Sequence, residues 1–430
     1  MKFLSLPFRL VAALSVASFR LAAVLIAAIA VVFANFLALF GVKSVFACGL
    51  NTLTSLIPDC YAALDVVSRE LVGFIPSVTR DSSADRVALN QTLRVLQTTA
   101  NTSGRNIAPA MSFPTTADQS PGNKSLTITK QRAFPFNWTG EEQKSINTGP
   151  GYLNVRQFNI AQALRAAVNE IEVDLAVAAQ LGSSRAYGTA GTTPFATNLA
   201  ESAQLKKILD DNGAPAADRS IVINTTGGAA LRTLLNNPLN ANIALTGDMT
   251  RQGMILDVNG FKFREAAQVQ SITKGTGTLY TSSAAGFAKG TTSIPIITGS
   301  GTVVAGDVIT FAGDTNKYVV TVGVAAPGTI TIAAPGLMQA LPASAQAMTI
   351  GGNYTANVGL SRNAMLLATR LPACPEEGDL AILRETITDP LSGLSFELVV
   401  WPGQRMILYE IGVCWGTLAV KPEHMAILLG

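Results

Sequence analysis

A long apolar run near the N-terminus places the first constraint on this chain. The residues from Leu21 to Val42 include no charged side chain, and Asn35 is the only strongly polar residue among them. About 20 apolar residues suffice for a helix that crosses a bilayer. Basic residues stand on both sides of the run, and the first acidic residue of the chain is Asp59. This arrangement is typical of a signal peptide or signal anchor, so the run alone predicts a membrane-bound or exported protein.

The remaining sequence has the composition of a protein that associates. Charged residues make up 14% of the 430 residues, against about 25% in typical soluble proteins. The stretch from Lys274 to Ser361 is poorer still, and its charged residues are Lys274, Lys289, Asp307, Asp314 and Lys317. A surface with so few charges tends to self-associate. The length exceeds what one hydrophobic core usually serves, so we expect about two or three domains.

The clearest predicted helix spans Asn159–Leu181. Its apolar residues recur at intervals of three and four and form one stripe, and Gly182 is placed to end the helix. Polar residues lie off this stripe, among them Arg165, Asn169 and Glu172.

More helix is predicted on the C-terminal side of this element. A second helix is predicted over Leu199–Asp211, where Asn212-Gly213 follows as a stop signal. The short strand Ser220–Asn224 then leads into a helix that contains Leu231, Leu234 and Leu235, which indicates an α/β layer.

Strand signals dominate after residue 250. Asn259-Gly260 predicts a hairpin turn between Met254–Val258 and Phe261–Arg264. From Lys274 to about Tyr354 helix signals are missing, and short strands separated by turn residues predict a small sandwich or barrel. These strands are Thr291–Ile297, Asp307–Phe311, Tyr318–Val322 and Thr329–Ile332. Such an island of β structure is best explained as an inserted domain.

The C-terminal part is predicted to be mostly β. Ser361–Arg370 is compatible with a short helix or a strand. A meander follows, with strands Leu380–Thr388, Leu394–Trp401 and Arg405–Trp415. A turn over Asp389–Gly393 joins the first two, with proline and glycine at the favoured positions.

Two segments near the N-terminus carry little core of their own. Asn51–Val78 has apolar residues at helical spacing and is predicted to be an amphipathic arm that seeks a partner surface. Thr79–Gly151 is polar and rich in Thr, Asn and Pro, with weak strand signals at Ser125–Thr129 and Phe134–Trp138. A long segment of this kind is either a functional loop or disordered.

Catalytic chemistry finds little support. His424 is the only histidine, so it alone could serve as the base of a Ser/His/Asp or Cys/His site, and a packed or solvent-facing histidine is the more frequent case. The adjacent carboxylates Glu376, Glu377 and Asp379, and the pair Asp210 and Asp211, could bind calcium or act as acid and base, but they fit solvated loop charges better.

Metal and phosphate motifs are also missing from the sequence. Cys48, Cys60, Cys374 and Cys414 lie far apart and form no zinc pattern, and unpaired thiols in a reducing compartment explain them best. Gly275-Thr276-Gly277 lacks the third glycine of a dinucleotide loop.

Sequence-read nucleic-acid binding has no better support. The net charge of +3 is small for such a partner. The tryptophans Trp138, Trp401 and Trp415 are too dispersed for a base-stacking platform. We therefore predict no catalytic, cofactor-binding or metal site, no cofactor, and no enzyme activity.

Both ends of the chain resemble the major capsid protein of tailed double-stranded DNA bacteriophages. Asn51–Asp59 followed by Tyr61–Leu71 is similar to the mature N-terminus of the coat proteins of Salmonella-type short-tailed phages. Thr388–Phe396 and the ending from Trp415 to Gly430 are similar to the C-terminal part of these proteins. The order of the predicted elements also fits, and the resemblance covers about Asn51 to Gly430.

The resemblance implies an α+β protein with the Hong Kong-type capsid fold, which comprises an N-terminal arm, an extended loop, a peripheral domain, an axial domain and an inserted small β-barrel domain. The implied division is an apolar leader outside the mature protein (1–49), a helical arm (50–78), an extended loop region (79–151), the peripheral and axial core with spine helix 159–181 (152–273), the inserted β domain (274–360) and the C-terminal β part of the core (361–430).

The function that the resemblance implies is structural. Copies of the chain would form hexamers and pentamers and close into an icosahedral shell around a double-stranded DNA genome. A scaffolding protein and a portal are implied partners, together with non-specific contact to the packaged DNA. The protein would be located in the virion, and in the host cytoplasm during assembly.

The apolar run departs from this resemblance, because a membrane helix on every copy would oppose shell closure. We expect that residues 1 to about 49 come from an upstream start assignment and that the membrane is not a partner. The alternative is a membrane-anchored or secreted bacterial surface protein with a β-rich adhesive domain. That alternative accounts for the run but explains neither the predicted spine helix nor the capsid-like ends.

Overall fold

The computed structural model describes residues 70–97, 109, 111, 122–146, 152–235, 257–389 and 392–430. All of them belong to one compact unit, Cys60–Gly430. The apolar run, Cys48, Cys60 and most of the predicted helical arm lie outside the described residues. Among the described residues, no helix is both long enough and apolar enough to cross a membrane.

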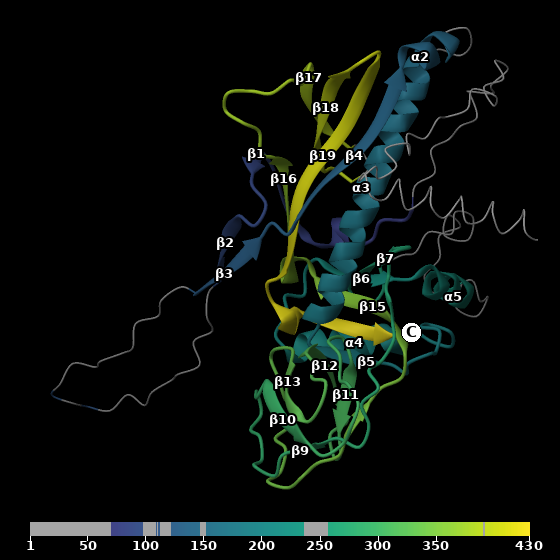
Figure 1. The fold of residues 1–430 in the computed structure, drawn as a ribbon. Coiled ribbons are helices and arrows are strands. Elements are labelled where there is room, and N and C mark those ends of the chain that lie inside the picture. Colours follow the sequence, from purple (N-terminus) through teal and green to yellow (C-terminus); the bar gives the residue numbers. More distant parts are fainter. Residues whose placement is uncertain are drawn as a thin grey trace, which may run out of the picture. The chain divides into compact units, whose positions relative to one another are not determined.

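The first sheet has six strands, in the order β1-β16-β19-β18-β17, with β4 on the other side of β19 (Figure 1). The strands are β1 (Thr79–Val87), β4 (Lys130–Thr139), β16 (Met365–Pro372), β17 (Leu383–Thr388), β18 (Ser395–Gly403) and β19 (Met406–Ala419). The predicted meander is confirmed as β17, β18 and β19, each antiparallel to the next. β19 extends beyond the predicted strand because its C-terminal half pairs with β16.

Helix α3 (Tyr152–Gly182) is the predicted spine helix, and it contacts β4 and β19 along the first sheet (Figure 1). Leu164, Val168 and Ile171 from its apolar stripe share one core with Ile411 and Trp415 of β19. The helix begins earlier than predicted, and the guanidinium of Arg156 lies 6.0 Å from the ring of Tyr409. Contact with the first sheet therefore stabilises the N-terminal turns of α3, where the apolar residues do not form a regular stripe.

A short helix that the sequence did not predict precedes α3. Helix α2 (Gly140–Ile146) follows β4 directly. Thr139 Oγ1 accepts the backbone N–H of Glu142, and Glu142 Oε2 accepts the backbone N–H of Thr139. This reciprocal pair is a capping box, which satisfies two backbone donors at the start of the helix.

The second sheet has twelve strands, of which nine follow the path β7-β6-β15-β20-β5-β12-β13-β10-β9. Six of its strands lie outside the β island, namely β5 (Arg185–Tyr187), β6 (Arg219–Ile223), β7 (Phe261–Glu265), β8 (Ser271–Ile272), β15 (Tyr354–Ser361) and β20 (Met425–Leu429). Helices α4 (Ala200–Asp211) and α5 (Thr225–Leu235) confirm the predicted helices. Leu205 and Leu209 of α4 share a core with Ile221 of β6 and Leu231 of α5.

The hairpin turn at Asn259-Gly260 is confirmed in its described part. Both residues have positive φ angles, 53° and 78°, as a tight type I′ hairpin turn requires. Val258 and Phe261 pair across the turn, while most of the predicted first strand lies outside the described residues.

The β island closes into a ring of strands around its own core. The strands are β9 (Thr281–Ser282), β10 (Ser293–Ile297), β11 (Val308–Phe311), β12 (Lys317–Val322), β13 (Gly328–Ile332) and β14 (Met348–Ile350). β14 returns to β9 through the hydrogen bonds Met348 N–H to Tyr280 O and Ser282 N–H to Gln346 O. The four predicted strands are confirmed, and pairing of β12 with β5 joins the ring to the second sheet. The status of 274–360 as an inserted domain stays a prediction.

Two predicted segments differ from the structure. Residues 70–78 contain only the 3-10 turn Ile75–Ser77 (η2), not a helical arm, because the carboxyl of Glu172 binds three of their backbone N–H groups. In the predicted polar loop the weak strand signals are confirmed, since Phe134–Trp138 lies within β4 and Ser125–Thr129 overlaps β3 (Gly122–Thr127). β1, which no strand signal in the sequence predicted, also joins the first sheet. The open choice at 361–370 resolves into the end of β15, a 3-10 turn and β16.

Candidate assembly surfaces

A two-stranded hairpin stands apart from both sheets (Figure 1). It consists of β2 (Thr92–Gln97) and β3 (Gly122–Thr127), paired antiparallel from Thr92–Thr127 to Gln97–Gly122. Exposure alternates along β2, and the side chain of Leu96 is 80% exposed. A hairpin of two strands is at best marginally stable in water on its own. Leu93 and Val95 on the other face of β2 pack against the core of the first sheet, so Leu96 is the apolar side chain of β2 that faces solvent.

The base of the hairpin, by contrast, is fixed to the first sheet. Leu126 and Ile128 are fully buried with Cys414 of β19. A Cβ at Gly416 would lie 2.3 Å from Thr127 O. The end of β3 can therefore pass this close to β19 only because Gly416 has no side chain. Lys124 Nζ donates to Val420 O at 2.5 Å. The hairpin thus leaves the subunit in a defined direction.

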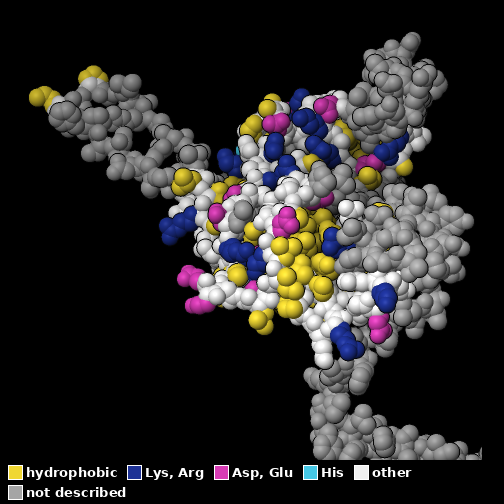
Figure 2. Space-filling model, turned by 90° about the horizontal axis from the view of Figure 1, so that it is seen from above, with side chains coloured by type: hydrophobic (Ala, Val, Ile, Leu, Met, Phe, Trp, Pro, Cys, Tyr) yellow, Lys and Arg dark blue, Asp and Glu magenta, His cyan; other side chains and the backbone are white. Residues whose placement is uncertain are grey.

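A second exposed surface lies at the opposite edge of the first sheet. β17 pairs with β18 and with no other described strand. The loop before it, residues 373–382, exposes Leu380 by 83% and Ile382 by 63%. Glu376 and Glu377 in the same loop are also exposed. Figure 2, which views the molecule of Figure 1 from above, shows hydrophobic side chains gathered in the middle of the described surface on that face.

Buried charge holds this edge in place. The side chain of Glu397 on β18 is 3% exposed and forms ion pairs with Arg86 of β1 and Arg384 of β17. Arg384 also pairs with Asp379 and lies over the ring of Trp401 at 5.5 Å. The loop is therefore anchored where it enters β17.

Two glutamates fix the segment that enters the fold at residue 70. Glu172 of α3 is fully buried, and its oxygens lie 2.6, 2.5 and 2.9 Å from the backbone nitrogens of Gly73, Phe74 and Ile75. Burial raises the pKa of Glu172, against the effect of these three donors. Glu70 accepts hydrogen bonds from Arg165 and Asn169, and the bond from Arg165 is the main cause that lowers the pKa of Glu70 to about 2.

His424, the one candidate base, is packed in the turn η4 (Pro422–His424) and is 8% exposed. Burial lowers the pKa of His424, and its Nδ1 has no hydrogen-bond partner among the described atoms. It is therefore a packed side chain with little access to solvent.

The candidate carboxylates are engaged in ion pairs or are exposed. Asp210 forms an ion pair with Arg219, and Asp211 forms one with Arg185. Both guanidinium groups are buried. The described residues contain no group of three or more His, Cys, Asp or Glu side chains that could hold a metal ion.

The other sequence candidates are also placed by the fold. Cys414 is buried, which raises the pKa of its thiol to about 11, and Cys374 is a free thiol in the exposed loop. Gly275 permits a close backbone approach to Thr302 O and donates its N–H to Asp307, so the Gly275–Gly277 segment is part of the β island. Trp138 and Trp415 lie in the main core, whereas Trp401 is only partly buried.

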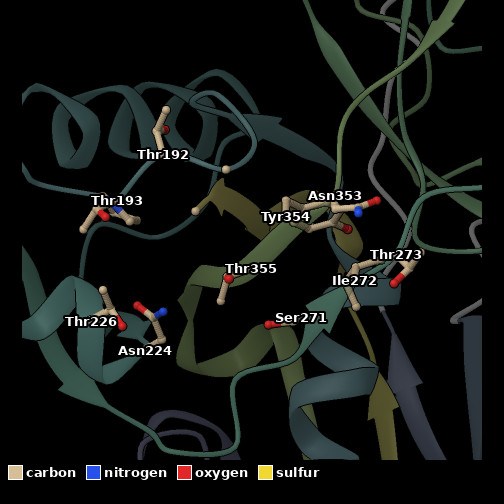
Figure 3. A pocket seen from close by; sticks show the side chains of 13 residues that line it. Thr192, Thr193, Asn224, Thr226, Ser271, Ile272, Thr273, Asn353, Tyr354 and Thr355 are labelled. Atoms are coloured by element: carbon tan, nitrogen blue, oxygen red, sulfur yellow. The ribbon is translucent and has the colours of Figure 1, made fainter.

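A polar cavity of about 430 Å³ lies beside the start of α5. Hydroxyl and amide groups from separate segments line it, among them Thr193, Asn224, Ser271, Asn353 and Thr355 (Figure 3). The lining contains no charged side chain, no histidine and no cysteine. The side chains of this cavity offer hydrogen bonding through neutral groups.

Sequence reasoning did not find the role of Glu172 or the hairpin base. Arg165, Asn169 and Glu172 were predicted only to lie off the apolar stripe; the segment that begins at residue 70 binds all three, and Glu172 is fully buried. The available signal was the recurrence of three hydrogen-bonding residues on one helical face.

No family model and no curated protein sequence matches the chain. Among solved structures, it is similar to a chain from Mycobacterium phage Che8, with 10% identity and a TM-score of 0.46, covering 87% of this chain and 97% of that one. It is also similar to the capsid of cyanophage P-SCSP1u, with 12% identity and a TM-score of 0.45, covering 85% and 91%. A third similarity is to the capsid of a native GTA particle, with 10% identity and a TM-score of 0.44, covering 89% and 98%.

Proposed function

We propose that this protein is a non-enzymatic structural subunit whose copies assemble into the icosahedral capsid of a tailed double-stranded DNA phage. The observation that carries the proposal is the β2–β3 hairpin, which is anchored at Leu126 and Ile128 but presents Leu96 to solvent. A hairpin that packs on its own subunit through Leu93 and Val95 but exposes Leu96 at its outer end is suited to contact a neighbouring molecule.

The second exposed surface supports the same proposal. The loop 373–382 places large apolar side chains beside an edge strand, and sheet edges of this kind are templates for association. The sequence resemblance at both ends of the chain supplies the identity of the assembly. Hexamers and pentamers of the chain, a scaffolding protein, a portal and non-specific DNA contacts are the partners that this function requires.

The division of the chain is part of the proposal. The first sheet with α3 corresponds to the peripheral domain, and the α4–β6–α5 layer corresponds to the axial domain. The hairpin corresponds to the extended loop, and the ring of β9–β14 to the inserted β domain. Residues 1 to about 49 are proposed to be absent from the mature subunit.

Expression of Asn51–Gly430, the proposed mature subunit, followed by sedimentation and electron microscopy of the soluble fraction, tests the proposal, and the full chain is fractionated in parallel. Closed shells, or rings of five or six subunits, are the expected result. Recovery of the protein as small assemblies in the membrane fraction would instead support a membrane-anchored surface protein. Monomers at all concentrations would overturn the self-assembly proposal.

A further inference from the structure

Two short turns carry the chain between the two sheets. The turn η3 (Arg362–Ala364) leads from β15 of the second sheet to β16 of the first, and η4 leads from β19 of the first sheet to β20 of the second. The two connections are bonded to each other, because the backbone N–H groups of Val420 and Lys421 both donate to Ala364 O, at 2.8 and 3.1 Å. This junction therefore helps to fix the orientation of one sheet relative to the other.

Three further elements hold the same stretch of chain, residues 420–425, which we call the junction segment. They are the base of the hairpin, the C-terminal end of α4 and the residues that follow α3. The donors are the Lys124 ammonium, 2.5 Å from Val420 O, the Asn212 amide, 2.7 Å from Glu423 O, and the Ser184 hydroxyl, 2.7 Å from Met425 O. Displacement of the junction segment would break contacts to all three elements.

His424 lies inside the junction segment. Its side chain is packed, and its Nδ1 is buried without a hydrogen-bond partner among the described atoms. Charged residues lie on its own turn and on the elements packed against that turn: Lys421 and Glu423, Arg219 with Asp210, Arg185 with Asp211, Lys124, and Arg362. Both carboxylates of α4 are already paired with arginine, so Glu423 is the one acid of this set without an ion pair in the described chain.

Protonation changes what the imidazole requires. A neutral ring carries one N–H, whereas the imidazolium carries an N–H on both nitrogens together with a positive charge. At His424 this places a donor in a buried position that has no acceptor. Burial is the main cause that lowers the pKa of His424 from its ordinary 6.5; Glu423 opposes the shift, and Lys421 and Arg219 add to it. Because an opened ring binds the proton more strongly, the closed junction loses stability as the pH falls below 6.5.

We propose that His424 is a proton-sensitive latch at the junction between the two sheets. With a neutral ring, the junction segment stays closed against Ala364, Asn212 and Ser184. Uptake of one proton from solvent moves the ring out of its buried position and opens these contacts, so the two sheets become free to reorient and the hairpin loses part of its base. The latch lies within one copy of the chain and is independent of the proposed function.

Amide hydrogen exchange of the full chain at a series of pH values tests the latch. Protection factors, which remove the intrinsic effect of pH on exchange, are expected to fall by about fivefold or more at Ser184, Val420 and Lys421 as the pH drops through 6.5. The N–H of Val303, which donates to Val324 O in the β island, is the internal control and should keep its protection. In His424→Gln, which takes up no proton, the fall should disappear.

Two changes beside the ring separate proton uptake from a purely structural role. Glu423→Gln removes the charge that raises the pKa of His424, so the fall in protection should move to lower pH. Lys421→Gln removes a charge that lowers this pKa, so the fall should move to higher pH. The backbone contacts of both residues are retained. The latch is wrong if protection at the junction does not change with pH, if His424→Gln shows the same fall, or if the two neighbouring changes do not shift it in opposite directions.

Discussion

Glu172 provides the sharpest test of how the fold is held together. It joins α3 to a segment 99 residues earlier in the chain, and its two oxygens accept three backbone N–H groups in a fully buried site. Replacement by glutamine keeps the shape but leaves one oxygen. If the amide oxygen takes the place of Oε1, the N–H of Ile75 lacks an acceptor; if it takes the place of Oε2, the N–H groups of Gly73 and Phe74 lack one. In both orientations the buried NH₂ group of the glutamine faces a backbone donor.

The magnitude follows from two opposing effects. Each buried donor left without a partner costs ~1–3 kcal/mol. Removal of a charge whose burial raises its pKa recovers part of this cost. We therefore expect Glu172→Gln to lower the free energy of unfolding by about 2 kcal/mol, a large part of the ~5–15 kcal/mol that stabilises a typical domain.

Urea denaturation and amide hydrogen exchange measure this effect. The control is Glu170→Gln on the same helix, where partly exposed ion pairs to Lys130 and Arg132 are lost. Such pairs contribute ~0.2–1 kcal/mol. Faster exchange at Gly73, Phe74 and Ile75 is expected only for Glu172→Gln. Equal stability of the two variants, with unchanged exchange at these amides, would refute the reasoning.

The other predictions concern pH, close packing and processing. Arg165 lowers the pKa of Glu70 to about 2, so this ion pair adds stability above pH 4.5, the ordinary pKa of the group, and loses it as the pH falls toward about 2. Denaturation at a series of pH values should show a shallower acid loss for Arg165→Gln, and an unchanged slope would contradict the assignment. Gly416→Ala introduces a Cβ 2.3 Å from Thr127 O, so it should lower the free energy of unfolding by ~1–3 kcal/mol and reduce assembly. The control Gly140→Ala, whose new Cβ meets nothing closer than 3.9 Å, should leave stability and assembly unchanged in the same assays. Mass spectrometry of purified particles should find no peptide from Leu21–Val42, and such peptides in mature shells would rule out the proposed start near Asn51.

Several elements followed from the sequence because local interactions decide them. The spine helix has an apolar stripe at helical spacing, and its interior was predicted correctly. The Asn259-Gly260 turn follows from the tolerance of these residues for positive φ angles. The four predicted strands of the β island alternate with turn residues and were also predicted correctly.

Other elements depended on partners far away in the sequence. β20 is a run of five buried residues, Met425–Leu429, and its local pattern does not show that it lies between β15 and β5. The ring of the β island closes through β9 and β14, which have two and three residues and no periodic signal. For such short segments, pairing with neighbours determines strand structure.

The sequence by itself determined the α+β composition, the long helix, the β island and the shortage of charge that indicates association. Tertiary structure decided which polar residues are buried and which surfaces remain open. The sequence placed Glu172 only off the apolar stripe of its helix, and residues 70–78 bury it, while β1, which no strand signal predicted, joins a sheet through pairing with β16. Local patterns depend on neighbours within a few residues, whereas burial and sheet pairing depend on which distant segments meet.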